Sequence, residues 1–169
     1  MGGKLFEAHG AERVSTQDLE TVLKPSLRQL FSLFGDVAYH FVDYVANKES
    51  HGDVDVLVMD QPGLTEKVLG VLHNQNYLTS KNGNVLSFLY QNRYQVDLLF
   101  TQPECFDYSK CYFAYNDLGG MLGRMTRKLG LKHGWQGLEY QQYTQDNKNL
   151  LATHFLTADH GVTLRVIRP

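Results

Sequence analysis

The stretch Ser50-His51-Gly52-Asp53-Val54-Asp55-Val56-Leu57-Val58 contains two aspartates separated by one apolar residue. Side chains of a β-strand alternate between its two faces, so a strand here places Asp53 and Asp55 on one face and the valines on the other, buried face. Two carboxylates held side by side repel each other, and a divalent cation relieves that repulsion. Gly52, directly before the pair, lets a backbone or a phosphate approach closely. The pattern predicts a strand that carries a candidate metal site.

A second apolar run, Tyr94-Gln95-Val96-Asp97-Leu98-Leu99-Phe100, contains a third acid. Asp97 has apolar residues on both sides, which makes a fully solvated side chain hard to explain. Three acids on two adjacent strands can hold a pair of Mg²⁺ ions, with Mn²⁺ as the alternative cation, and two such ions drive in-line phosphoryl transfer. The open alternative is a half-exposed strand whose acids lie in water without an ion. Asp53, Asp55 and Asp97 are therefore the candidate metal ligands and catalytic residues.

At 169 residues and 43% hydrophobic composition, the chain can form one ordinary domain, or a core with a small appendage. Its mean hydropathy is −0.33, and no apolar run approaches the ~20 residues needed to cross a bilayer. The two cysteines, Cys105 and Cys111, do not indicate a disulfide framework. These features predict an intracellular monomer without a membrane partner.

The formal net charge is −2, but the charges are unevenly distributed. Residues 119–134 carry four basic side chains and no acid, whereas many of the acids gather in the first half of the chain. Bound cations invert the local sign of an acidic site, so a basic segment beside it fits a phosphodiester substrate. The alternative for the basic run is a solvated helix face.

The first half of the chain alternates predicted helices and strands. Residues 1–14 carry little pattern and predict a flexible N-terminus. Ser15 or Thr16 caps a helix that continues to Gly35, with a kink at Pro25. Further elements are predicted as strands over 37–45, 52–59, 84–91 and 94–101, and a helix over 64–77.

The character of the sequence changes after residue 102. Residues 110–113 predict a short aromatic strand, and Asn116 is placed to cap a helix that continues to about Leu129. The predicted apolar stripe of that helix comprises Leu118, Met121, Leu122, Met125 and Leu129. Short strands are predicted near 131–133, 149–156 and 162–167.

These segments together resemble the family X DNA polymerases, within the polymerase beta-like nucleotidyltransferase superfamily. Residues 49–57 resemble the motif with the family's first two aspartates, and residues 94–98 the strand with its third. Residues 111–117, the basic helix and the Gly-Leu element at 137–140 follow in the order seen in the family's thumb. The resemblance spans roughly residues 38–140, and the layout is similar to that of the minimal palm-plus-thumb polymerases, one of which is viral.

The resemblance implies an α+β fold. It implies a nucleotidyltransferase palm over residues 15–104, with a mixed sheet and helices on one face, followed by a small α/β thumb over residues 105–169. Asp53 and Asp55 would ligate both metal ions, and Asp97 would ligate the catalytic one and help activate a primer 3′-hydroxyl. The implied partners are a DNA primer-template and a nucleotide triphosphate.

The resemblance also implies the nucleotide and DNA contacts. Tyr112 and Phe113 match a Tyr-Phe pair that lies under the sugar, and Arg124 matches a thumb arginine that reaches the template minor groove. The implied nucleotide-binding set is Gly52, Lys48, Tyr112, Phe113, Asn116 and Asp117. The implied DNA-binding set is Arg124, Arg127, Lys128 and Lys132.

The chain departs from the family pattern at two turns. The family has Gly-Ser and a nearby arginine around the incoming triphosphate, and residues 42–48 contain neither. Asp43 there would repel a triphosphate, and Lys48 can supply a point charge but not a bidentate contact. Residues 114–116 replace the family's Thr-Gly-Ser with Ala-Tyr-Asn.

Three functions therefore remain open. The first is a small DNA-directed DNA polymerase that acts on gapped or nicked DNA by two-metal phosphoryl transfer. The second is a non-templated nucleotidyltransferase that acts on RNA or a small molecule. The third is a catalytically impaired DNA-binding module with the polymerase fold.

Overall fold

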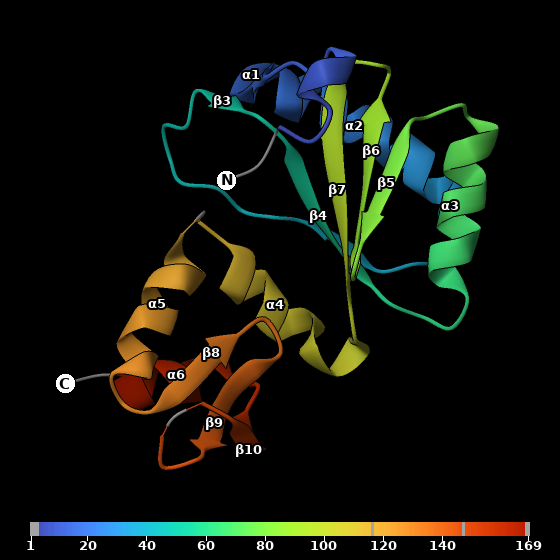
Figure 1. The fold of residues 1–169 in the computed structure, drawn as a ribbon. Coiled ribbons are helices and arrows are strands. Elements are labelled where there is room, and N and C mark those ends of the chain that lie inside the picture. Colours follow the sequence, from blue (N-terminus) through green and yellow to red (C-terminus); the bar gives the residue numbers. More distant parts are fainter. Residues whose placement is uncertain (1–3, 116, 147, 168–169) are drawn as a thin grey trace. The chain divides into compact units, whose positions relative to one another are not determined.

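The fold is described from a computed structural model, which covers residues 4–115, 117–146 and 148–167. The chain divides into two compact units, Met1–Pro103 and Glu104–Pro169, and each is described by itself (Figure 1). Each contains helices and strands, so the predicted α+β class is confirmed. Among the described residues, no helix has the length and apolar character needed to span a membrane. Asn116, the predicted helix cap, lies outside the described residues.

A five-stranded mixed sheet forms the centre of the first unit. Its strands, in spatial order, are β2 (Tyr39–Phe41), β4 (Val54–Met59), β7 (Tyr94–Thr101), β6 (Val85–Tyr90) and β5 (Thr79–Asn82). Strands β4 and β7 are parallel, and the other neighbours are antiparallel. A separate two-stranded pairing joins β1 (Val14–Ser15) to β3 (Ser50–His51).

The helices of the first unit bury one face of this sheet. They are α1 (Thr16–Asp18), the π-helical turn η2 (Leu19–Leu23), α2 (Lys24–Phe31), η3 (Ser32–Phe34) and α3 (Leu64–Asn74). The short helix η1 (Glu7–His9) buries none of its residues and does not belong to this layer. Alternate residues of the central strands, including Val56, Phe88 and Leu98, form one core with residues such as Leu27 and Val68 of the helices. Because strand side chains alternate, Asp55 and Asp97 lie on the opposite face. This packing explains why the valines of residues 54–58 alternate with other residues: they form the buried face of β4.

The N-terminal segment needs a correction from residue 4 onward. The sequence predicts a flexible N-terminus over residues 1–14, but η1 and β1 form there and Phe6 is buried. The Glu12 backbone N–H donates to the carbonyl of Arg93 at 2.7 Å, which ties the segment to the start of β7. Residues 1–3 lie outside the described residues. The sequence signal is weak because only two buried side chains, Phe6 and Val14, and a few backbone bonds hold the described part of the segment.

The first helix begins and bends as its sequence suggests. The Ser15 hydroxyl accepts the backbone N–H of Asp18 at 3.0 Å and caps the N-terminus. The predicted kink at Pro25 takes the form of the π-turn η2 just before it, because proline has no N–H to donate within the helix. The helical run ends at Gly35, whose φ of 92° favours glycine.

The second unit combines helices with a three-stranded antiparallel sheet. The helices are α4 (Phe106–Phe113), preceded by the short η4 (Pro103–Cys105), α5 (Leu118–Arg127) and α6 (His160–Ile167). The strands β8 (Leu131–Gly134), β9 (Gly137–Tyr143) and β10 (Leu150–Thr157) lie in the order β10-β9-β8.

Two predicted strands of the second unit are helices. Residues 110–113 are the end of α4, which buries Phe106, Tyr108 and Ser109. Residues 162–167 belong to α6, where Thr163 and Ile167, four residues apart, are the buried positions. Asp159 accepts the backbone N–H of Val162 at 2.8 Å, so a helix cap precedes the alternating apolar residues that indicated a strand.

Helix α5 packs closely on the end of α4. A Cβ atom on Gly119 would lie 2.2 Å from the Tyr112 carbonyl oxygen, so glycine permits this contact. Leu122 is buried as predicted, whereas Met121, Met125 and Leu129 are about half exposed. The predicted apolar stripe therefore needs correction, because the buried side of the helix includes Gly119 and Thr126 instead.

Candidate metal centre

Strands β4 and β7 bring the three predicted acids together. Asp55 and Asp97 are register partners in the parallel pair, and Asp53 directly precedes β4 on the same face as Asp55. One carboxylate oxygen of each residue can be chosen so that all three lie within 4.8 Å of one another. Each residue is partly buried. The site is thus a compact group of like charges on a rigid sheet.

The surroundings disfavour the charged forms of these acids. Burial, together with the neighbouring charges of Asp53 and Asp97, raises the pKa of Asp55 to about 7, while Lys48 acts in the opposite direction. Burial also raises the pKa of Asp97, although hydrogen bonds from Ser87 and Gln95 oppose that rise. A cation held among the three oxygens would stabilise their charged forms.

The donor set fits a hard divalent cation. Carboxylate oxygens suit Mg²⁺ and Mn²⁺ and not the softer ions that prefer sulfur or imidazole. Oxygens on one Mg²⁺ lie about 2 Å from it, and paired ions lie roughly 3.5–4 Å apart. The three carboxylate oxygens, within 4.8 Å of one another, lie close enough to share such ions. Asp53, Asp55 and Asp97 are the residues that would hold such ions.

Gln95 is a supporting residue that the sequence analysis did not select. Its side-chain amide donates to both carboxylate oxygens of Asp97, at 3.1 and 3.0 Å. The available signal was its position two residues before Asp97, which places both side chains on one face of the strand.

The loop before Asp53 is tethered to the start of the first helix. The Thr16 hydroxyl donates to the Lys48 carbonyl oxygen, and the Thr16 backbone N–H donates to the Glu49 carbonyl at 2.9 Å. His51 is buried, its Nε2 atom lies 3.0 Å from the Thr16 hydroxyl, and its ring contacts that of Tyr44. Burial lowers the pKa of His51 to about 4, so its ring is neutral near pH 7. The loop that carries Lys48 and Gly52 is thereby fixed on the first unit.

The two charged residues of this loop differ in their surroundings. Lys48 contributes positive charge at Asp55, which lowers the pKa of that acid. Asp43 is exposed and its Oδ2 atom lies 3.6 Å from Nε2 of His40. Of the two, Lys48 is thus the one that acts electrostatically on the candidate metal centre.

The predicted sugar-binding residues lie in the second unit. Tyr112 and Phe113 end α4, with rings edge to face and centroids 5.0 Å apart. The Tyr112 ring also lies against His133, at 5.1 Å between centroids. Asp117 is the N-terminal flanking residue of α5, and Asn116 is outside the described residues. The aromatic pair is therefore partly engaged in packing within its own unit.

The predicted DNA-binding residues lie at the end of α5 and on β8. Arg124, Arg127 and Lys128 are exposed, and within the described part of the chain no acidic side chain pairs with them. Lys132 differs, because its ammonium lies 3.0 Å from a Glu139 carboxylate oxygen. Three of the four cations are thus available to an anionic partner.

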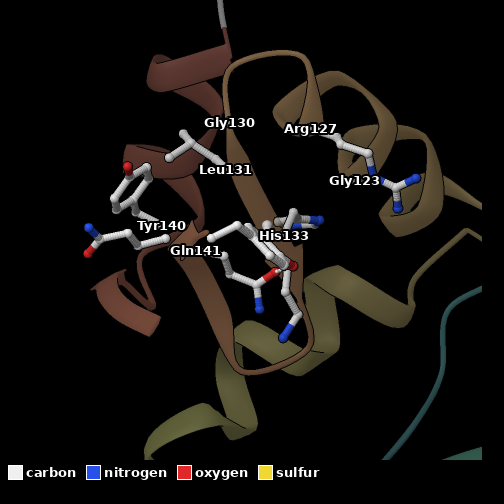
Figure 2. A pocket seen from close by; sticks show the side chains of 10 residues that line it. Gly123, Arg127, Gly130, Leu131, His133, Tyr140 and Gln141 are labelled. Atoms are coloured by element: carbon white, nitrogen blue, oxygen red, sulfur yellow. Dashed lines mark hydrogen bonds between the residues drawn. The ribbon is translucent and has the colours of Figure 1, made fainter. Parts of the chain in front are cut away.

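A hollow of about 1140 Å³ lies beside two of these cations (Figure 2). Arg127 of α5 and Lys132 of β8 line it together with Tyr140, Gln141, Gln142 and Tyr143 of β9, among other residues. Nothing in the sequence singles out Gln141, Gln142 and Tyr143, because only the fold brings β9 beside the basic segment.

Comparison with known proteins adds no relative. No family model matches this chain, and no curated protein matches its sequence.

Proposed function

We propose that the chain is a metal-dependent nucleotidyltransferase, and specifically a small DNA-directed DNA polymerase of the family X type that acts on gapped or nicked DNA. The observation that carries the proposal is the convergence of Asp53, Asp55 and Asp97 from two parallel strands. Such a group of carboxylates fits the two-ion chemistry of phosphoryl transfer better than any other site in the described residues.

The proposed roles follow from position and charge. Asp53 and Asp55 hold the cations, and Asp97 binds one of them beside the primer terminus. Bound Mg²⁺ supplies Lewis-acid activation of the 3′-hydroxyl and neutralises charge on the triphosphate. The Asp97 carboxylate, beside that terminus, would accept the hydroxyl proton. Lys48, fixed by the Thr16 tether, supplies positive charge in place of the family's arginine.

The second unit supplies the proposed nucleic-acid contacts. Arg124, Arg127 and Lys128 form an exposed basic set on α5, which suits sequence-independent contact with phosphates. Tyr112, Phe113 and Asp117 keep their proposed role beside the nucleotide.

Primer extension on a gapped DNA duplex tests the proposal. Extension by the templated nucleotide, with Mg²⁺ or Mn²⁺ required, supports it. Asp97→Asn should abolish extension, whereas Asp36→Asn, which changes an exposed acid of the same unit, should not. Addition of one nucleotide type without a template would favour the non-templated enzyme. Tight DNA binding without turnover, unchanged in Asp97→Asn, would favour a DNA-binding module.

A further inference from the structure

The Asp97 carboxylate is held by neutral donors on two sides. Gln95 lies two residues earlier on β7, and its Nε2 atom donates to both Asp97 oxygens, at 3.1 and 3.0 Å. Ser87, the register partner of Asp97 on β6, also hydrogen-bonds to this carboxylate. Both donors are uncharged, so they hold Asp97 without neutralising the charge that a cation needs.

Gln95 itself is held by the N-terminal segment. Its side chain is only 4% exposed, and its Oε1 atom accepts the backbone N–H of Leu5 at 3.2 Å. This contact assigns the amide orientation, because a backbone donor requires the oxygen of Gln95 on its side and leaves the NH₂ group for Asp97. The chain of bonds runs from Leu5 through Gln95 to Asp97.

The N-terminal segment is anchored so that it can hold this orientation. Phe6 is buried next to Leu5, and the Glu7 backbone N–H closes a turn on the carbonyl of Lys4 at 3.3 Å. Farther along, a Glu12 carboxylate oxygen lies 2.7 Å from Nε of Arg93, just before β7. The turn that spans Leu5 and the anchors that follow it leave its N–H little freedom to move away.

Without this support the three acids would favour a different arrangement. Their like charges, with oxygens within 4.8 Å, push Asp97 away from Asp53 and Asp55 when no cation is bound. Two donors on Asp97 oppose that rotation and keep its oxygens in place before the cation arrives. Such preorganisation by partners outside the ligand set typically changes metal affinity 10–100-fold.

We propose that Gln95 is a positioning residue for metal binding, and that residues 4–12 are part of the metal site because Leu5 orients Gln95. This inference rests on the proposed function, since it requires Asp53, Asp55 and Asp97 to bind divalent cations. It adds a role for residues 4–12, which act on Asp97 through Gln95.

Titration of the full chain with Mn²⁺ tests the inference without requiring turnover. Binding is measured by the loss of the free-ion signal in electron paramagnetic resonance. Gln95→Met keeps the side-chain size and removes both the donor and the acceptor of the amide, and should weaken Mn²⁺ binding about tenfold or more. Gln29→Met is the matched control on an exposed position of α2 and should bind as the unsubstituted protein does.

A second pair of variants tests the backbone contact. Leu5→Pro removes the N–H donor at the second position of a turn that accepts proline, whereas Leu5→Ala keeps the donor and trims a half-exposed side chain. Leu5→Pro should weaken Mn²⁺ binding several-fold, by less than Gln95→Met, and Leu5→Ala should leave it unchanged. This pair decides the question if Gln95→Met does not fold.

The outcomes separate the two proposals. Mn²⁺ binding that is unchanged in folded Gln95→Met, or equal in Leu5→Pro and Leu5→Ala, overturns the positioning role and leaves the proposed function standing. No Mn²⁺ binding by the unsubstituted protein overturns the proposed function and this inference with it. Weaker binding in Gln95→Met and Leu5→Pro, with both controls unchanged, supports the positioning role.

Discussion

Asp55→Asn should stabilise the metal-free protein at alkaline pH while removing metal binding. The pKa of Asp55 is about 7, against an ordinary value of 3.8, mainly because of burial. The folded chain therefore holds a proton that the unfolded chain releases, so this residue lowers stability progressively as pH rises from about 4 to about 7. Above that range its contribution is constant.

The size of the effect follows from the same pKa values. A separation of about three pH units between 3.8 and about 7 corresponds to ~4 kcal/mol at most. Since solvent reaches the partly buried carboxylate, we expect Asp55→Asn to gain ~2–4 kcal/mol at pH 8. The gain should be smaller at pH 5, where Asp55 is already protonated in the folded chain.

Urea unfolding with a chelator, at pH 5 and pH 8, measures this difference. Hydrogen exchange of β4 and β7 amides reports on the first unit separately from the second. Asp55→Asn must be compared with the unsubstituted protein at each pH. The low pKa of His51 makes the stability of both proteins rise with pH over part of the same range. A variant that is no more stable than the unsubstituted protein at pH 8, or whose gain does not grow with pH, would refute the reasoning.

Three further predictions concern packing, acid stability and nucleic-acid binding. Gly119→Ala should destabilise the second unit by more than ~2 kcal/mol, because a Cβ there would lie 2.2 Å from the Tyr112 carbonyl oxygen. Gly120→Ala, with open space at its Cβ, should instead gain up to ~1 kcal/mol, and Trp135 fluorescence during urea unfolding follows both. His51→Gln should remove the part of the stability that the protein loses as pH falls from 6.5 to about 4, as thermal unfolding at several pH values would show. Arg124→Ala should make the salt dependence of DNA binding shallower by about one unit of slope, and an unchanged slope would argue against the basic face of α5 as the interface.

The strands that carry the acids could be predicted from sequence because two simple periodicities coincide there. Val54, Val56 and Val58 fill the core beneath the helices, so Asp55 must face the other way. The pairing of β4 with β7 could not be derived from either strand alone, since nothing in their sequences specifies a parallel neighbour. The register of Asp55 with Asp97 then places the carboxylates together.

Other features depend on contacts that no local pattern encodes. Residues 162–167 alternate like a strand, but the Asp159 cap and the burial of Thr163 and Ile167 favour a helix. The link from Leu5 to Gln95 joins residues ninety positions apart through one backbone hydrogen bond. The hollow beside Arg127 likewise exists only once β9 is placed beside β8.

Anomalous diffraction from crystals of this protein soaked in Mn²⁺ tests the central claim most directly. We predict anomalous density between the carboxylates of Asp53, Asp55 and Asp97, with Gln95 still bonded to Asp97. Crystals that take up Mn²⁺ elsewhere, or in which these three carboxylates turn apart without an ion between them, would contradict it.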